Sequence, residues 1–247
     1  MISHQKWSLV QQNEKKSWMA NRKKYIVDDF KMKLRLRAEQ HEKWISQFIQ
    51  LKENSKIMEI GGAAEPIIDF FTKGMLVSLD PLNNFYLEQF SHLFNSRLTR
   101  IQATAEEIPF DSQFFDLIII YNVLDHTQNP SKVISEIFRC LKSEGALALS
   151  VDTFPVYWVW GRKFFPLLGG HDHLLHPHSF SVGKVLRLIK RMGFNILEAK
   201  LDLFIPQKEK NNQIGSIRQK VYSLLNYKRQ RIFIIAKKRE QSQTYSF

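Results

Sequence analysis

Hydrophobic positions along the chain change their spacing near residue 56. Between Trp18 and Leu51, apolar and aromatic residues recur among Lys, Arg and Glu, which predicts one or two amphipathic helices. Beyond that point, short apolar runs alternate with longer segments of helical spacing. The apolar runs predict strands at 56–61, 75–80, 97–103, 115–122, 145–152, 195–205 and 229–238, and the segments between them predict helices at 65–73, 83–95, 130–142 and 179–192.

This alternation predicts an α/β fold. Residues 117–120 read LIII, a continuous apolar run typical of a strand that is covered on both faces of its sheet. Strands that alternate with helices imply βαβ units and a parallel sheet. We expect an N-terminal helical cap at 1–55 and one α/β domain at 56–247, with an aromatic and histidine-rich segment at 153–178 and a basic insertion at 206–228.

Composition narrows the class of protein. A hydrophobic fraction of 44% with 19 Phe excludes a disordered chain. The single cysteine, Cys140, excludes an internal disulfide framework and a CxxC metal site. No apolar run approaches the ~20 residues of a membrane span, and the N-terminus lacks the apolar core of a signal peptide. We therefore expect a soluble, cytoplasmic protein.

The formal net charge of +12 is unevenly distributed. Residues 1–56 carry a net +7, residues 57–183 a net −6 and residues 184–247 a net +11. Basic ends can steer anionic partners such as phosphorylated small molecules, anionic lipid or RNA. They can equally be the solvated helix faces of a basic protein.

The segment KIMEIGGAAEP, residues 56–66, has the pattern of a ligand-binding turn between a strand and a helix. Glycines at such a turn let the backbone approach a ligand closely, because no Cβ intervenes. About twenty residues later Asp80 ends the next strand, at the sheet edge where open α/β folds bind ligands. Its carboxylate can accept both hydroxyls of a ribose, or Asp80-Pro81 can form a plain turn.

Four stretches in this order resemble the class I S-adenosylmethionine-dependent methyltransferases, in particular the small-molecule enzymes of ubiquinone and menaquinone biosynthesis. They are MEIGG, VSLDP, ATAEEIPFDSQFFDLIIIYNVLDH and NPSKVISEIFRCLKSEGALALS, and the ending GHDHLLHPHSFSVGKVLRLIKRMGF is a looser match. The resemblance covers residues 56–152 and extends loosely to Phe194. It implies a Rossmann-like, seven-stranded, mostly parallel sheet with helices on both faces and an antiparallel last strand.

The resemblance also implies S-adenosyl-L-methionine as the cofactor. The residues that it assigns to cofactor binding are Glu59, Gly61, Gly62, Ala63, Asp80, Pro81, Thr104, Ala105, Glu106, Tyr121 and Asn122. Ala63 and Glu65 stand where the family's loop usually has glycine, and Thr104 stands where relatives often have an Asp that holds the adenine amine. Thr104 can still accept a hydrogen bond. Glu65 either caps the following helix or faces the methionine ammonium.

Methyl transfer to a hydroxyl benefits from a general base, and histidine is the usual choice near neutral pH. His126 matches a position where relatives often have His near the cofactor, although it can also order its loop. His173 lies where the resemblance places acceptor-side residues. The surrounding histidines have no paired helical spacing, so we expect no metal site. The aromatic stretch 154–165 can form the wall of an apolar acceptor pocket or a hydrophobic lid on the sheet, and the two are compatible because a lid can also be a pocket wall.

The leading hypothesis is an S-adenosylmethionine-dependent methyltransferase acting on a small-molecule, sugar or lipid-linked acceptor, at oxygen. The alternatives are a non-catalytic binding protein that keeps the fold, and an RNA ribose methyltransferase that uses the basic ends. Tyr121-Asn122-Val123 does not resemble the Asn/Asp-Pro-Pro-Tyr/Phe motif of enzymes that methylate base amines. A basic surface can also rest on an anionic membrane.

Overall fold

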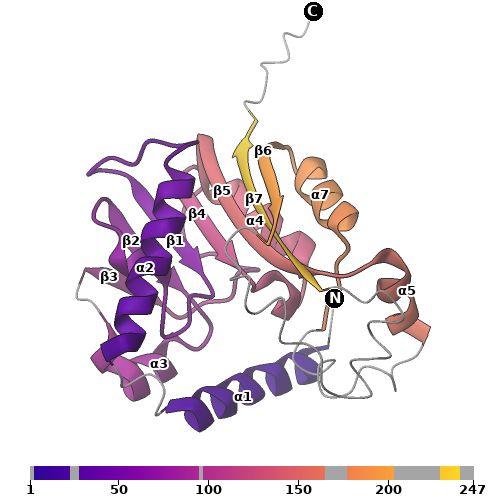
Figure 1. Cartoon of the computed structure of the whole chain (residues 1–247), viewed down its shortest axis with the longest axis horizontal. Helices are drawn as coiled ribbons and strands as arrows, with labels where there is room; N and C mark the ends of the chain where they lie inside the picture. Colours follow the sequence, from indigo (N-terminus) through magenta and orange to yellow (C-terminus); the bar gives the residue numbers. More distant parts are fainter. Residues whose placement is uncertain (1–2, 23–27, 95–96, 165–176, 203–228, 240–247) are drawn as a thin grey trace, which may run out of the picture.

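The computed structural model describes residues 3–22, 28–94, 97–164, 177–202 and 229–239. These residues are built around one mixed β-sheet (Figure 1). The strand order is β3-β2-β1-β4-β5-β7-β6. The strands are β1 (Lys56–Ile60), β2 (Met75–Leu79), β3 (Leu98–Ile101), β4 (Phe115–Tyr121), β5 (Leu141–Thr153), β6 (Phe194–Leu201) and β7 (Gln230–Lys238). Strand β7 runs antiparallel to β5 and β6, and the other pairs are parallel. The predicted seven-stranded sheet with an antiparallel last strand is confirmed.

Helices connect the strands and precede them. The α-helices are α1 (His4–Asn21), α2 (Asp28–Ile45), α3 (Asn83–Phe90), α4 (Pro130–Cys140), α5 (Val156–Phe164) and α7 (Val182–Arg191), and the 3₁₀ turns are η2 (Ile67–Phe70), η3 (Ser91–Leu93) and η4 (Leu124–His126). The Ser181 hydroxyl accepts a hydrogen bond from the Lys184 amide and caps α7. None of the described helices is long and apolar enough to cross a membrane.

Both faces of the sheet are covered. Side chains alternate along β4, so that Ile118 and Ile120 enter a core closed by α4 and α7, while Leu117 and Ile119 enter a second core closed by α2. The near-continuous apolar sequence of β4 follows directly from this arrangement. Helix α2 is thus part of the folded core of the domain.

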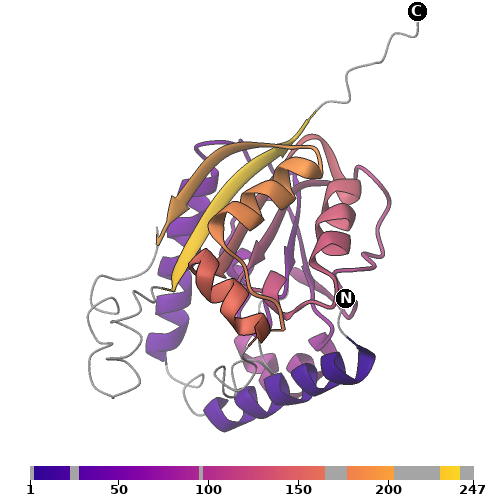
Figure 2. The ribbon, with the colours of Figure 1, turned by 90° about the vertical axis from the view of Figure 1, so that its right-hand side faces the viewer.

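The strand order reverses at β1, which has β2 on one side and β4 on the other. Ile60 is in register with Ile120, so the turns that follow β1 and β4 lie side by side at the carboxyl edge of the sheet. Ligands of open α/β sheets bind at such a switch point. Helix α1 runs along the same edge (Figures 1 and 2), where Trp18 packs edge-to-face on Tyr86 and Phe90 of α3, with ring centroids 5.5 and 5.4 Å apart.

The structure corrects several sequence-based boundaries. The helix predicted at 65–73 is only the 3₁₀ turn η2, because Pro66 and Phe71 at its two ends have extended backbones. The helix predicted at 83–95 stays α-helical only to Phe90. The aromatic stretch, which has no clean period, contains helix α5, and strand β5 begins at Leu141, four residues before its predicted start.

Candidate cofactor and active site

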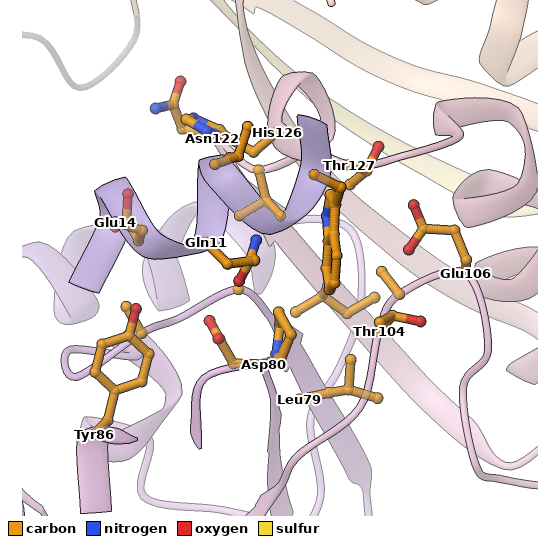
Figure 3. A pocket seen from close by; sticks show the side chains of 18 of the residues that line it. Gln11, Glu14, Leu79, Asp80, Tyr86, Thr104, Glu106, Asn122, His126 and Thr127 are labelled. Atoms are coloured by element: carbon orange, nitrogen blue, oxygen red, sulfur yellow. The ribbon is translucent and has the colours of Figure 1, made fainter. Parts of the chain in front are cut away.

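A cavity of about 400 Å³ lies at the carboxyl edge of the sheet, beneath α1 (Figure 3). The strand-end turns supply its floor and α1 supplies one wall. Its lining residues are Trp7, Val10, Gln11, Glu14, Ile60, Gly61, Ala63, Leu79, Asp80, Pro81, Tyr86, Thr104, Ala105, Glu106, Asn122, Val123, His126, Thr127 and Arg229.

Gly61 brings the turn after β1 against the turn after β4. A Cβ at this position would stand 2.3 Å from Cγ2 of Val123, which is far closer than non-bonded carbon atoms approach one another. The Gly61 backbone also has a φ of +71°, in the left-handed region that favours glycine. The cavity floor therefore requires glycine here for two independent reasons.

Ala63 keeps the backbone conformation of a glycine although it carries a methyl group. Its φ is 52°, which costs a non-glycine residue about 1–2 kcal/mol. The buried Arg100 guanidinium holds the turn, since Nη1 donates to the Ala63 carbonyl at 3.0 Å while the group stacks 3.4 Å over the Phe94 ring. The departure from glycine at this position thus leaves the shape of the loop intact.

Asp80 places a buried carboxylate in the cavity. Its side chain rises from the end of β2 beneath α1, which carries Gln11 and Glu14 (Figure 3). Oδ1 accepts a hydrogen bond from the Leu82 amide at 2.8 Å. Burial raises the pKa of Asp80 to about 6, while backbone amides including that of Leu82 act in the opposite direction. Asp80 is therefore ionised near neutral pH and available to a hydroxyl-bearing ligand.

The floor and walls fit S-adenosylmethionine. The close backbone approach at Gly61 and the buried acceptor at Asp80 suit an adenosyl group, and Thr104 and Ala105 line the same cavity. Glu106 has a supporting task, because its Oε1 accepts the amides of Gln128 and Asn129 at 2.7 and 3.0 Å. It ties the turn after β3 to the start of α4.

The turn after β4 contributes Asn122 and His126. Asn122 has a φ of 58°, and its buried Oδ1 has no hydrogen-bond partner among the described residues. Strained, unsatisfied groups of this kind occur at ligand sites. His126 Nε2 lies 3.8 Å from Oδ2 of Asp125, whose carboxylate is almost fully buried, and the imidazole itself is one quarter exposed. Of these two residues, His126 lines the cavity.

Three of the expected cofactor residues lie behind the cavity wall. Glu59 is buried beneath the turn and its pKa is raised to about 7, mainly by burial. At Gly62 a Cβ would stand 2.6 Å from the Cβ of Pro66, so this glycine serves the packing of the turn. The Tyr121 ring packs 4.7 Å from that of His41 and 6.1 Å from that of Phe233, on the α2 side of the sheet.

The prediction that Glu65 caps the following helix is wrong. The residue at the N-cap position of η2 is Pro66, which makes no side-chain cap bond, and it is Glu59 Oε2 that accepts the amide of Ile68 at 3.1 Å from beneath the turn. The carboxylate that serves this 3₁₀ turn therefore comes from the preceding strand.

His173 and most of the histidine-rich segment lie outside the described residues. His178, at its end, places Nε2 3.0 Å from the Thr127 carbonyl, and burial lowers its pKa. It thereby fixes the turn that carries His126. Within the described ranges, no group of three His, Cys, Asp or Glu residues could hold a metal ion.

The sequence led us to expect N-terminal helices over the site, but it did not indicate which of their residues line the cavity, nor the contribution of Arg229. Trp7, Gln11 and Glu14 face the cavity from a helix that precedes the first recognisable motif. Arg229 immediately precedes β7, and its guanidinium forms an ion pair with Asp152 of β5. Only the antiparallel pairing of these two strands brings it to the site, so no local pattern could have indicated it.

Comparison with known proteins agrees with this geometry. Residues 66–149 match the family described as methyltransferase domain. A chloroplastic 2-methyl-6-phytyl-1,4-hydroquinone methyltransferase of Spinacia oleracea is 25% identical over 120 residues, which are 45% of this chain and 33% of that protein. Sterol 24-C-methyltransferase erg6 of Schizosaccharomyces pombe is 26% identical over 179 residues, 64% of this chain and 44% of the yeast protein. The chain thus spans less than half the length of either relative.

The fold has close structural counterparts. Geranyl diphosphate C-methyltransferase from Streptomyces coelicolor A3(2), solved with Mg²⁺, geranyl diphosphate and S-adenosyl-L-homocysteine, aligns with a TM-score of 0.63 at 13% identity, over 86% of this chain and 85% of that one. At this identity the likeness shows the fold alone. The sequence match over 66–149 and this likeness of fold both support a class I S-adenosylmethionine-dependent methyltransferase.

Proposed function

We propose that this protein transfers a methyl group to a hydroxyl oxygen of a small acceptor with a largely apolar body, such as a lipid-linked molecule or a ring alcohol. The observation that carries the proposal is His126, which lines the same cavity as Asp80 and has the buried carboxylate of Asp125 beside it, with Nε2 and Oδ2 3.8 Å apart. The names of the relatives support an apolar acceptor, since they specify a phytyl hydroquinone and a sterol.

The cofactor residues would be those that line the floor. Asp80 would accept the hydroxyls of the ribose, Thr104 and Ala105 would face the adenine, and the turn at Gly61 would lie against the methionine portion. When bound, S-adenosylmethionine supplies a methyl group on a sulfonium sulfur, ready for in-line displacement. Trp7 and Val10 of α1 would exclude water from this side of the cavity.

His126 would act as the general base. Its Nε2 would take the proton of the acceptor hydroxyl, and the buried carboxylate of Asp125 would stabilise the imidazolium that results. Asn122, with its buried Oδ1, would accept a hydrogen bond from the ammonium of the cofactor or from the acceptor. His173, outside the described residues, remains the second proposed base.

A second candidate reaction is methylation of a carbon atom, which the names of the yeast and Streptomyces proteins specify. The same histidine would then take a proton from the methylated carbon skeleton. Isotope-labelled methyl transfer to a panel of phenols, quinols and isoprenoid alcohols, followed by NMR of the products, distinguishes an O-methyl from a C-methyl signal.

Calorimetric titration with S-adenosylmethionine and S-adenosylhomocysteine comes first. Micromolar binding would support a working cofactor site. Absence of binding at millimolar ligand would overturn the proposal in favour of a protein that keeps the fold without the reaction.

A further inference from the structure

Helix α5 exposes large apolar side chains. Trp160 is 64% exposed, Val156 60% and Tyr157 53%, and the first two are the most exposed large hydrophobic residues in the described part of the chain. Val156 and Trp160 are four residues apart and therefore lie on one side of the helix, with Tyr157 beside Val156. A patch of this kind on a folded domain marks an interaction surface.

Helix α7 exposes basic side chains. Val185 and Ile189 are buried against the sheet, and the opposite side of the helix carries four basic residues and no acidic one. The four are exposed: Lys184, Arg187, Lys190 and Arg191. The helix therefore presents a uniformly positive surface.

The two helices start from the same point in the fold. The end of β5 bridges Phe180 through Thr153, and the Phe154 amide donates to the Phe180 carbonyl at 2.8 Å. Helices α5 and α7 begin at Val156 and Val182, each only a few residues beyond this bridge. Both views show them as neighbours on one side of the molecule (Figures 1 and 2). We call this side the α5–α7 face.

We propose that the α5–α7 face docks onto a membrane surface that contains anionic lipid. Trp160, Tyr157 and Val156 would enter the headgroup layer, where amphipathic aromatic rings are favoured. The basic residues of α7 would meet the anionic headgroups. A protein partner fits less well, since lysine is depleted at protein interfaces whereas basic and aromatic residues together suit a lipid surface.

Each Lys or Arg side chain that lies near an anionic membrane surface raises the affinity of the protein for that membrane by about fivefold. Sedimentation of the full-length protein with phosphatidylcholine vesicles, and with vesicles that also contain phosphatidylglycerol, provides the test. Binding should require the anionic lipid. Arg187→Gln should weaken it about fivefold, and Trp160→Ala should reduce it further by removing the apolar contact.

Arg35→Gln is a matched control for charge. Arg35 is exposed on α2, which covers the opposite face of the sheet, and its replacement changes the net charge by the same amount as Arg187→Gln. The control variant should bind like the wild type. Equal weakening by both variants would show that only the overall charge matters, and would overturn the proposal.

Tryptophan fluorescence with brominated lipids locates the contact. The chain contains five Trp. Quenching should be strong in the wild type and much weaker in Trp160→Phe, a variant that keeps an aromatic ring and should still sediment. Undiminished quenching in Trp160→Phe, or failure of the wild type to sediment with either vesicle, would overturn the proposal. These experiments need no cofactor, so their failure and the failure of the proposed methylation are separate results.

Discussion

Glu59 and Ile68 are joined by a buried hydrogen bond in which Oε2 accepts the backbone amide at 3.1 Å. The bond links the end of β1 to the 3₁₀ turn η2, and so holds the turn after β1 from beneath. Glu59 is 3% exposed, and burial raises its pKa to about 7. The hydrogen bond of Glu59 stabilises the turn, whereas burial of its charged carboxylate destabilises the folded state.

Glu59→Gln should change how stability depends on pH. The raised pKa means that, between about pH 4.5 and about pH 7, the folded state binds more protons than the unfolded state. The free energy of unfolding contributed by Glu59 therefore falls as pH rises through this window, by an amount on the order of 3 kcal/mol. Glutamine keeps an acceptor for the Ile68 amide but does not titrate.

Urea unfolding of both proteins across that pH window checks this prediction. The variant should gain stability relative to the wild type as pH rises. A difference that stays constant with pH would mean that Glu59 has an ordinary pKa, whatever its hydrogen bond contributes.

Asp80→Asn should weaken binding of S-adenosylhomocysteine by about 1–3 kcal/mol, because a charged acceptor is lost from a buried site. In the wild type the pKa of the free carboxyl is about 6, so affinity should fall as pH drops below that value. The variant should show no such fall. Calorimetric titration at several pH values measures both effects.

Glu88→Gln is the control for Asp80→Asn. Glu88 is exposed on α3 and does not line the cavity, and its replacement removes the same charge. If Asp80→Asn binds no more weakly than Glu88→Gln, the ribose contact must lie elsewhere.

Ala63→Gly should raise the free energy of unfolding by up to about 1 kcal/mol. The backbone at Ala63 is left-handed, and glycine removes the strain of this conformation, which stabilises the folded state. Glycine also makes the unfolded chain more flexible, which offsets part of that gain. Ala64→Gly is the matched control, because Ala64 is 2% exposed and packs beside Tyr86 without a positive φ. That change should lower stability. Loss of stability in both variants would show that the Ala63 methyl contributes more than its strain costs.

The strands of the sheet could be predicted from the sequence because their positions follow from which residues are buried. All seven strands follow from apolar runs, and even the two-sided burial of β4 is visible in the run LIII. The turn after β1 was less predictable. Its local sequence suggests a helix capped by Glu65, but the acceptor comes from Glu59, which can be recognised only when β1 and η2 are placed in space.

The candidate site was predictable where it follows strand ends. Gly61, Asp80, Asn122 and His126 lie on the cavity because the carboxyl ends of parallel strands converge. Tyr121, the immediate neighbour of Asn122, was expected beside them but faces α2, because side chains alternate along β4 and Tyr121 lies on the same side as Leu117 and Ile119. Helix α1 forms a wall of the cavity because it packs on α3, which is distant in sequence, and no local motif predicts that contact.

His126→Gln should separate catalysis from loop order. If His126 is the general base, turnover should fall by about 10²–10⁴-fold while the affinity for S-adenosylhomocysteine stays within a few-fold of the wild type. Asp125→Asn should lower turnover less, because it removes only the carboxylate charge that would stabilise the protonated His126 imidazole and leaves the base itself in place. His92→Gln, at an exposed position in η3, should leave both quantities unchanged. Loss of thermal stability in His126→Gln with turnover per folded molecule preserved would assign this residue to loop structure, and would leave His173 as the proposed base.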